Sequence, residues 1–149
     1  MANVVPYSFA QELLKGAHNF PTNTIFIALY EAGSGAPYAV SDTAYSSGTA
    51  NQVGTSGTGY TTGGKTLQNG TVANQTSVAT LTFDTISWTS ATFGAAYGVL
   101  YNNSSSDKLI VVLDFGGTKS CSNGTFTITF PSTSSGTPAG SDSLISITS

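Results

Sequence analysis

The chain of 149 residues has no arginine and very little charge of any kind, since Asp, Glu, Lys and Arg together make up 7% of it. Its four basic residues are the dispersed lysines Lys15, Lys65, Lys108 and Lys119, and the formal net charge is −3. Binding to nucleic acid requires clustered cations that neutralise phosphates, and a membrane-surface segment requires a basic face. We therefore expect neither nucleic acid nor membrane as a partner.

Cysteine and long hydrophobic runs are equally scarce. Cys121 is the single cysteine, so neither an internal disulfide nor a thiolate metal cluster can form, and we predict a small, partly buried strand residue. No segment approaches the length of a membrane span. The first six residues lack the basic region and the long apolar stretch of a secretion signal, so no export is expected.

Apolar and aromatic residues are present in quantity, at 39% and 11% of the chain. This is enough for the core of one domain covering residues 1–149, and the aromatic content separates the chain from disordered proteins. The surface must then consist mainly of Ser, Thr, Asn and Gly. A protein packed against neighbours tolerates such a surface better than a freely diffusing one, which relies on charge for solubility.

A short helix is expected close to the N-terminus. Ser8 is the candidate N-cap, and Gln11 three residues later would complete a capping box. Gly16 provides a stop signal. The expected apolar stripe consists of Phe9, Leu13 and Leu14. A helix this short must dock on other structure, and we expect it to cover one face of the strand Thr24–Tyr30, which is apolar on both faces.

Residues Glu31–Thr76 are rich in Gly, Ser, Thr and Ala and show no strong period. A stretch of this length is typical of a long loop or an extended functional arm, or of a set of short, weak strands. No periodic pattern buries its tyrosines, so we predict that they contact another chain. These candidates are Tyr38, Tyr45 and Tyr60. Pro131–Ser149 is expected to form a flexible C-terminal arm, within which Leu144–Ile147 could be a short strand.

The second half of the chain alternates apolar and polar residues with the period of β-strands. The expected strands are Ala79–Trp88, Phe93–Tyr101, Leu109–Phe115 and Thr125–Phe130. We expect a bulge at Asp84–Thr85, a hairpin loop at Asn102–Asp107, a break at Gly116–Gly117 and a turn at Asn123–Gly124. The predicted fold class is mainly β, a single antiparallel β-sandwich or barrel with one short N-terminal helix and long Gly/Ser/Thr-rich loops.

The alternate residues of Phe93–Tyr101 are predicted to lie on one face of their strand. Trp88, Phe93, Tyr97 and Tyr101 would form either part of the core or an exposed platform that stacks on carbohydrate, and their alternation favours the core.

One motif suggests a nucleotide site. Gly59–Thr66 matches the phosphate-loop pattern G-x-x-x-x-G-K-[ST], and Leu109–Asp114 reads as an apolar strand that ends in a possible Mg²⁺ ligand. A phosphate loop needs a buried strand before its glycines and a helix that begins at the Lys-Thr pair. Residues 46–58 contain one sizeable apolar residue, and Asn69–Gly70 signals a turn. We therefore expect no nucleotide, and leave a nucleotide-binding protein as the remote alternative.

Catalytic residues are not evident either. Hydrolysis needs a nucleophile, a base and an orienting group held together, and His18, the only histidine, sits where a helix dipole partner or cap is usual. The seven carboxylates are dispersed, although a glycosidase pair such as Asp84 and Asp114 could still meet in space. Most aspartates at strand ends form turns. We expect no enzyme, with no catalytic, cofactor-binding or metal-binding residues, no cofactor and no small-molecule substrate.

Several segments, taken in order, show a resemblance to a known family. They are Tyr7–Gly16, Asn23–Tyr30, Gly57–Leu67, Trp88–Tyr101, Leu113–Gly117 and Asn123–Ile128. In order and spacing they look like a family of small structural proteins from tailed bacteriophages, over roughly residues 5–130. The family has no catalytic residues to transfer, and in such proteins the Gly-Gly-Lys-Thr run implies no nucleotide.

The resemblance implies a structural protein of the virion, assembled in the cytoplasm of the bacterial host. We expect a capsid decoration or cement protein that binds the major capsid protein and copies of itself as a homo-oligomer, because symmetry multiplies modest contacts. The alternative is a tail-associated or fibre protein, with glycan binding through exposed aromatics. If Glu31–Thr76 is an arm, deletion of Tyr38–Gly57 should leave a folded monomer that no longer binds capsids.

Overall fold

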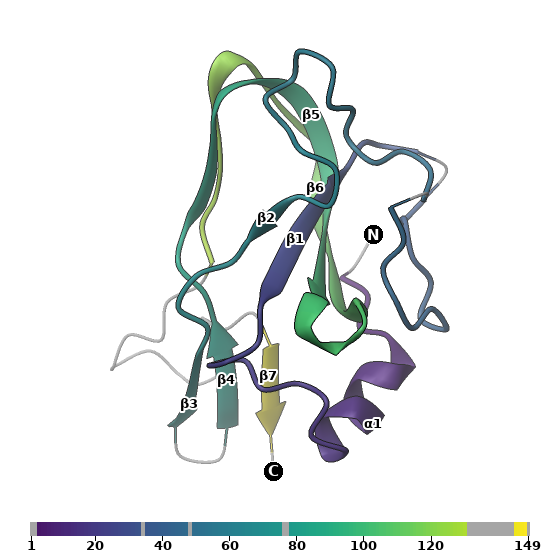
Figure 1. The fold of residues 1–149 in the computed structure, drawn as a ribbon, viewed down its shortest axis with the longest axis vertical. Coiled ribbons are helices and arrows are strands. Elements are labelled where there is room, and N and C mark those ends of the chain that lie inside the picture. The colour runs from purple at the N-terminus through teal and green to yellow at the C-terminus, as the bar shows by residue number, and fades with distance from the viewer. Residues whose placement is uncertain (1–2, 34, 48, 76–77, 131–144, 149) are drawn as a thin grey trace.

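The computed structural model describes residues 3–33, 35–47, 49–75, 78–130 and 145–148. They form a four-stranded and a three-stranded antiparallel sheet together with one α-helix (Figure 1). Neither sheet closes into a barrel within these residues, and the arrangement is that of a β-sandwich. The predicted fold class is therefore confirmed, with the sandwich in place of the barrel.

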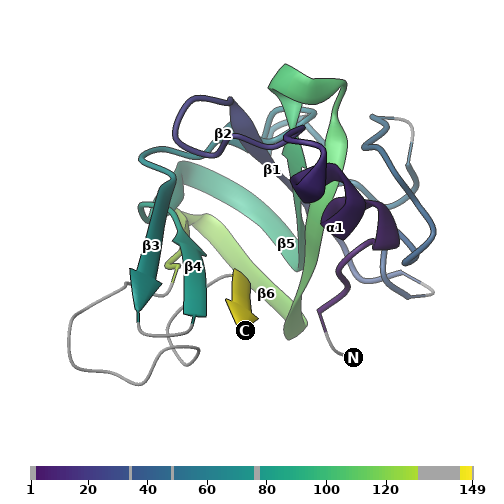
Figure 2. The ribbon, with the colours of Figure 1, turned by 90° about the horizontal axis from the view of Figure 1, so that it is seen from below.

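The larger sheet has the strand order β2-β1-β5-β6. Its strands are β1 (Ile25–Tyr30), β2 (Lys65–Thr66), β5 (Ile86–Asn102) and β6 (Lys108–Ile128). The last two form a long hairpin that is closed by the short 3-10 helix η1 (Asn103–Ser105), in agreement with the predicted hairpin loop. The hairpin is curved. Its open end, where β5 begins and β6 ends, reaches toward the smaller sheet (Figure 2).

The smaller sheet has the strand order β3-β4-β7. Its strands are β3 (Thr71–Gln75), β4 (Val78–Thr82) and β7 (Ile145–Thr148). The pairing of β7 with β4 confirms a short strand near the C-terminus. The rest of the predicted C-terminal arm, residues 131–144 and 149, lies outside the described residues.

The expected strand Ala79–Trp88 is in fact two strands that belong to different sheets. β4 ends at Thr82 and β5 begins at Ile86, so the predicted bulge at Asp84–Thr85 is wrong. Phe83 and Ile86 are both buried between the sheets, whereas Asp84 and Thr85 are exposed at the corner. Two apolar side chains that enter the same core three residues apart require the chain to change direction there.

Gly116–Gly117 does not end a strand as predicted, because β6 continues through it. Tyr97 lies opposite Asp114, but Ala95 lies opposite Lys119, so extra residues of β6 bulge out at this point. The two glycines have φ values of +69° and +116°, which glycine adopts without steric cost. The bulge bends the hairpin and leaves it intact.

The predicted turn at Asn123–Gly124 is also a bulge. Asn123 has a φ of +46°, and Ser90 on β5 has a φ of +51°. The register shifts on both sides of the pair Ala91–Gly124, and Asn123 N donates to Thr92 Oγ1 at 2.9 Å. The predicted fourth strand is therefore the end of β6.

The irregularity between Ala95 and Tyr97 reverses which side chains of β5 face which side. Phe93 and Ala95 lie in the core between the two sheets, whereas Tyr97, Val99 and Tyr101 lie on the opposite face of the larger sheet. The prediction that alternate residues of Phe93–Tyr101 share one face is therefore wrong. A one-residue offset is enough, because side chains alternate with a period of two.

Two apolar cores cover the two faces of the larger sheet. The inner core, toward the smaller sheet, includes Ile27 and Leu29 of β1. The outer core, on the other face, includes Ala28 and Tyr30. These neighbours alternate along β1 and are all fully buried, which confirms a strand that is apolar on both faces. The outer core is completed by the long loop after β1, through Ala36, Tyr38 and Tyr45.

The helix α1 (Tyr7–Leu14) does not begin as predicted. Its N-cap is Pro6, with φ −60° and ψ 144°, and no side chain caps it. Ser8 lies inside the helix, and its buried Oγ has no hydrogen-bond partner within the described structure. The capping box with Gln11 is therefore wrong. The fixed φ of proline already suits the entry to a helix.

The packing of α1 also differs from the prediction. Phe9 is buried and Leu13 is partly buried, but Leu14 is 91% exposed, and Glu12 takes a buried place. The helix packs beside β6, and its Phe9 belongs to the inner core that also contains Ile27 of β1. Gly16, with a φ of +72°, ends the helix region as predicted.

Candidate functional site

The phosphate-loop motif adopts a geometry that cannot hold a nucleotide in the usual way. Lys65 and Thr66 form β2, and they pair with Ile27 and Phe26 of β1. A phosphate loop needs a helix to begin at this point, so that its dipole and free N–H groups face the anion. The remote nucleotide-binding alternative therefore has no local support.

The lysine of the motif has an internal role. Lys65 Nζ donates a hydrogen bond to Ser87 O at 2.6 Å and lies 5.7 Å from the centroid of the Trp88 ring, a cation–π distance. Asp114, the possible Mg²⁺ ligand of such a site, lies on β6, which is three strands away from β2 in the sheet. At the usual spacing between strands this corresponds to about 14 Å. Asp114 Oδ1 instead accepts a hydrogen bond from Gly116 N at 2.8 Å.

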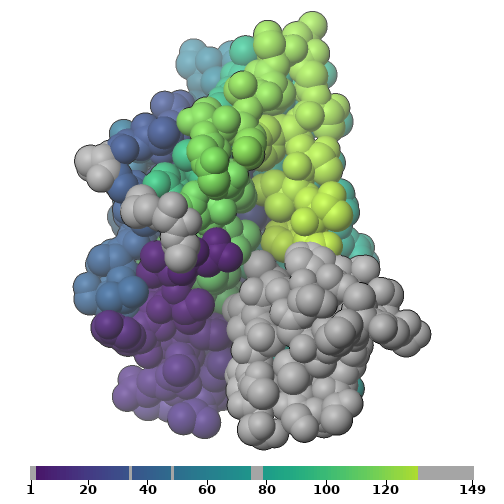
Figure 3. All heavy atoms as spheres, turned by 180° about the vertical axis from the view of Figure 1, so that it is seen from behind, coloured from purple at the N-terminus to yellow at the C-terminus, as the bar shows by residue number. Residues whose placement is uncertain are grey.

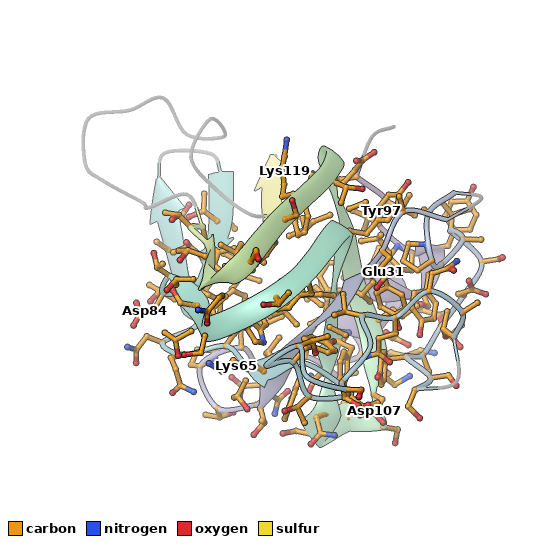
Figure 4. The ribbon with its side chains drawn as sticks, turned by 90° about the horizontal axis from the view of Figure 1, so that it is seen from above. Glu31, Lys65, Asp84, Tyr97, Asp107 and Lys119 are labelled. Atoms are coloured by element: carbon orange, nitrogen blue, oxygen red, sulfur yellow. The ribbon has the colours of Figure 1, made fainter. Side chains whose placement is uncertain are left out.

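The possible glycosidase pair does not form. Asp84 precedes β5, whereas Asp114 lies opposite Tyr97, eleven residues along β5 from Ile86. A strand of this length spans on the order of 30 Å, whereas glycosidase carboxylates stand about 5–9.5 Å apart. Figure 4 shows Asp84 and Tyr97 on opposite sides of the molecule. Asp84 Oδ2 accepts a hydrogen bond from Asn69 Nδ2 at 2.6 Å.

The four aromatic residues of β5 are core residues, as their alternation favoured. Their exposed fractions are 8% or less. They are Trp88, Phe93, Tyr97 and Tyr101. Trp88 and Phe93 pack edge to face in the inner core with ring centroids 6.3 Å apart. They do not form an exposed carbohydrate platform in the described structure.

Two of the three tyrosines of the long loop are buried and not free to contact another chain, contrary to our prediction. For the third, Tyr45, the contact with another chain stays a prediction. Tyr38 and Tyr60 are only 6% and 3% exposed, and they belong to the outer and inner core respectively. Tyr45 is half-buried and stacks on Tyr101 with centroids 4.1 Å apart. The reason is that β1 has apolar side chains on both faces of the larger sheet. The smaller sheet covers one face, and the loop covers the other. In the described part of Glu31–Thr76, the chain up to Gly64 is therefore a loop packed on the sheets and not an extended arm. The part after it contains the short strands β2 and β3, which agrees with the alternative of short, weak strands.

The hydroxyl of Tyr38 fixes the middle of this loop. Tyr38 Oη accepts a hydrogen bond from Ser46 N at 2.8 Å and lies 2.8 Å from Thr49 Oγ1. It also lies 3.3 Å from the hydroxyl of the fully buried Tyr30 on β1. One side chain thus joins two parts of the loop to the sheet.

Tyr60 fixes the end of the loop in a similar way. Its Oη accepts hydrogen bonds from Leu29 N at 2.9 Å and from Gln52 Nε2 at 3.1 Å. Tyr101 Oη, on β5, donates to Gly63 O at 2.8 Å. We call these residues the tyrosine clasp: Tyr30, Tyr38, Tyr45, Tyr60 and Tyr101. It fastens the loop over β1 and β5 through hydroxyl groups.

Four hydroxyls of the clasp, those of Tyr30, Tyr45, Tyr60 and Tyr101, stay protonated at neutral pH because their pKa values are raised. Burial raises the pKa of Tyr30, Tyr60 and Tyr101 above the usual 10, because the phenolate loses hydration. Burial also raises the pKa of Tyr45. In this protonated form the hydroxyls serve as the donors and acceptors of the hydrogen bonds that hold the loop on the sheet.

A buried polar cluster joins α1 to the closed end of the long hairpin, next to η1. Glu12 is only 6% exposed, and its Oε1 accepts a hydrogen bond from Lys108 Nζ at 2.6 Å. Its other oxygen lies 3.2 Å from His18 Nε2. His18 is 8% exposed and its ring stacks on Phe20. The prediction that His18 is a helix cap or dipole partner is wrong, because the ring turns inward to this carboxylate.

The hydrogen bonds of the cluster define the tautomer of His18. Asn23 Oδ1 accepts a hydrogen bond from Asn19 N at 2.8 Å, which identifies this side-chain atom as the oxygen. The side-chain atom of Asn102 that lies 2.8 Å from Asn23 Oδ1 must therefore be the donor Nδ2. Asn102 Nδ2 also lies 3.1 Å from His18 Nδ1, which must accept. The proton is then on Nε2 and is donated to Glu12, as in a neutral imidazole.

Burial lowers the pKa of His18 below 6.5, and the hydrogen bond and charge of Glu12 oppose this shift only in part. The unfolded chain therefore takes up a proton at a higher pH than the folded protein. We expect the free energy of unfolding to fall as the pH drops below 6.5, and to be insensitive to this group above it. Urea unfolding across a pH series measures this dependence.

His18→Gln is the matched variant for this measurement, since glutamine keeps a hydrogen-bonding side chain but does not titrate. We expect its pH dependence to be flatter than that of the wild type near pH 6. The same acid sensitivity in both proteins would contradict the assignment.

Sequence reasoning could not have found this cluster. Glu12 and Lys108 are separated by 96 positions, and neither stands in a motif. Among the described residues no group of three or more His, Cys, Asp or Glu side chains is placed to hold a metal ion. Cys121 is partly exposed on β6, as predicted. In the same residues, no helix has the length and apolar character needed to cross a membrane.

No protein-family model, curated protein or solved structure matches this chain. The resemblance to virion proteins therefore stays a prediction that rests on the sequence segments themselves.

Proposed function

We propose that this chain is a structural protein of a bacteriophage virion, and specifically a decoration or cement protein of the capsid. The proposal rests on the order and spacing of the segments between residues 5 and 130, together with the β-sandwich in which they meet. In this role the protein binds the major capsid protein at many symmetry-related positions, where repetition turns modest contacts into firm attachment.

The observation that carries the proposal is that the side chains which most suggested chemistry hold the fold together. Lys65 binds a backbone carbonyl, and His18 lies in a buried cluster with Glu12 and Lys108. The tyrosines that suggested flexible contacts form the clasp. What such a chain offers to a partner is the shape of a polar surface with little charge, as a building block requires.

The clasp changes how such a protein would dock. A free arm would become ordered on contact with the capsid and lose conformational entropy in doing so. The hydrogen bonds of Tyr38 and Tyr60 hold this part of the loop in the free protein. Most of the conformational entropy of the loop is therefore lost on folding and not on binding. We therefore expect the protein to bind as a preformed body, with little change of the described loop.

Particles provide the direct test. We expect purified virions to contain this protein in many copies, as measured by quantitative mass spectrometry, and image reconstruction to place it on the outer shell. Particles that lack the protein should lose their genome at a lower temperature than complete particles. Adding the purified protein back should restore the higher temperature, because a cement protein adds contacts between capsid subunits.

The alternatives give different results in the same experiment. Antibody labelling at the tail, with few copies in each particle, would favour the tail-associated or fibre protein. Absence of the protein from purified virions would contradict every virion role. Deletion of Tyr38–Gly57 is not a suitable probe of binding, because it removes two residues of the clasp, Tyr38 and Tyr45, and uncovers the outer core.

A further inference from the structure

A polar hollow lies where β2 leads into β3. It has a volume of about 460 Å³, and its walls come from the loop before β1, the segment 66–71 and the corner after β4. Phe20 and Phe83 also line it, but they are only 8% and 5% exposed. Most of the more exposed residues in the described lining carry amide or hydroxyl groups. They are Asn23, Thr24, Thr66, Gln68, Asn69 and Thr71.

A second hollow continues from the first. It has a volume of about 530 Å³ and shares Thr66 and Gln68 with the first hollow. Phe26, which is half-buried, lines it and lies opposite Thr66 in the register of β1 and β2, so both side chains are on the same face of the sheet. Pockets for small ligands measure about 300–1,000 Å³. We call the two hollows together the amide groove, and each of them has room for a ring of a ligand.

The corner after β4 holds one wall of the amide groove in place. Asp84 N donates a hydrogen bond to Gln68 O at 3.1 Å, and Asp84 Oδ2 accepts one from Asn69 Nδ2 at 2.6 Å. Asn69 has a φ of +52°, a left-handed conformation that asparagine tolerates better than most residues. The Asn69 side chain is thus held through its nitrogen, and within the described structure its Oδ1 remains available as an acceptor.

Asn23 is fixed on another wall in the opposite sense. Its Oδ1 accepts hydrogen bonds from Asn19 N and Asn102 Nδ2, both at 2.8 Å. Its Nδ2 has no partner among the described residues and keeps two hydrogens to donate. The amide groove therefore offers a donor and an acceptor whose positions are set by folding. Groups that are fixed in advance lose little entropy when a ligand binds.

The lining has almost no charge, which limits the kind of ligand. Lys65 is the only charged side chain among the described residues of the lining, and its Nζ is bound to Ser87 O. An anion such as a phosphate would require several cationic donors. A divalent cation would require carboxylate ligands, and none lines the groove in the same residues. A mainly apolar ligand would require an apolar lining. The ligand that fits is neutral and rich in hydrogen-bonding groups.

We propose that the amide groove binds a neutral oligosaccharide. Each hydroxyl of a sugar both donates and accepts hydrogen bonds, and an amide side chain supplies a donor and an acceptor on adjacent atoms. The half-buried ring of Phe26 gives the apolar face of a sugar ring a surface to pack on. The site differs from the aromatic platform considered for β5, whose rings are buried, and its ligand undergoes no reaction.

An extended peptide is the competing ligand for such a groove. It would have to pair with β2, which lies at the edge of the larger sheet. This strand consists of Lys65 and Thr66 alone, so it offers only a short row of backbone groups. The amides and hydroxyls of the lining would not contribute to that pairing, whereas a saccharide uses them directly.

NMR titration of the isotope-labelled protein tests the proposal, because it detects weak binding and locates it. The probes are hexasaccharides of glucose, mannose, galactose and N-acetylglucosamine. We expect at least one of them to cause saturable shifts in the side-chain amide signals of Asn23, Gln68 and Asn69, with a dissociation constant on the order of 1 mM. The matching monosaccharide should bind about tenfold more weakly, since it fills only one hollow. The anionic hexagalacturonate should cause no saturable shift.

Two substitutions remove amide groups from the groove. Gln68→Ala removes an exposed side chain that makes no hydrogen bond within the described structure. Asn69→Gly removes the other amide, and glycine adopts the left-handed backbone at this position freely. We expect each variant to weaken binding of the saccharide by about tenfold and to unfold close to the wild-type temperature, because both side chains are exposed.

Gln11→Ala is the matched control, since Gln11 is an exposed glutamine that lines neither hollow. It belongs to α1, and Figure 3 shows this part of the chain (purple) next to β6 (green). β6 and β2 lie at opposite edges of the larger sheet. Gln11→Ala should therefore bind the saccharide as the wild type does.

Three results would overturn the proposal. The first is the absence of saturable shifts with all four hexasaccharides. The second is binding that shifts residues outside the amide groove, or that Gln68→Ala weakens no more than Gln11→Ala does. The third is saturable binding of an extended peptide rich in Ser and Asn but of no saccharide, which would assign the groove to strand pairing at β2. The proposed place in the virion is tested separately by the protein content of particles, so either proposal can fail without the other.

Discussion

Replacing Gly64 by alanine should lower the free energy of unfolding by about 3 kcal/mol or more, which is a large effect for a single methyl group. A Cβ atom at this position would lie 1.8 Å from Ile27 O and 2.8 Å from Ala28 Cα. Both are backbone atoms of the central strand β1, so no flexible side chain can move aside. The chain would have to separate β2 from β1.

Gly57→Ala is the matched control for this prediction. Gly57 and Gly64 have similar φ values of +71° and +84°, but nothing lies within 4 Å of a Cβ added at Gly57. Alanine there should cost only the strain of the left-handed conformation, about 1–2 kcal/mol. Urea unfolding followed by the fluorescence of Trp88, the single tryptophan, measures both. Equal losses in the two variants would show that the contact with β1 contributes nothing.

Replacing Tyr60 by phenylalanine should cost about 2 kcal/mol, although the ring and its packing are kept. The lost hydroxyl is the acceptor for Leu29 N, on a residue that is fully buried in β1. A buried N–H group without a partner keeps its full desolvation cost. Gln52 Nε2 would lose the same acceptor. The end of the clasp should therefore loosen while the sheet stays folded.

Hydrogen exchange at Leu29 reports on this change directly. We expect the Leu29 amide to exchange much faster in Tyr60→Phe than in the wild type, because the hydroxyl that protects it is gone. Tyr7→Phe is the control, since Tyr7 is 75% exposed and its hydroxyl has no buried partner to lose. It should change the free energy of unfolding by less than about 0.5 kcal/mol. Unchanged exchange at Leu29 would rule out this role for Tyr60.

These two sites explain why the segment after β1 behaves as a fixed loop. Gly64 allows the chain to pass directly over β1, and Tyr60 attaches to the backbone of the same strand. In the role that we propose, such a loop would present a defined surface to the capsid without first having to become ordered. On the proposed function, the docking surface should then be sought on the outside of the folded loop.

Several parts of the fold could be predicted because they depend on near neighbours. The alternation of apolar residues in β1 predicted a strand buried on both faces, and Gly16 predicted the end of α1. The aromatic residues of β5 were expected in the core for the same reason. The rejection of the phosphate loop also rested on local sequence, and the pairing of Lys65 with Ile27 agrees with it.

Other features had no local signal. Gly116–Gly117 and Asn123–Gly124 are strong turn signals in isolation, yet the pairing with β5 holds β6 in a strand on both sides of them. The hydrogen bonds of the surrounding ladder outweigh the local preference of two glycines. The phase of side chains along β5 could not be predicted either, because the bulge that reverses it depends on the partner strand.

By itself the sequence determined the class of the protein, with one β-rich body, a short helix and a surface with little charge. Only the tertiary structure decided that Tyr38 and Tyr60 are buried, that Glu12 meets Lys108, and that Leu14 points outward. The physical reason is that patterns two to four residues apart specify strands and helices. Which face of them is covered depends on segments that arrive from distant positions in the chain.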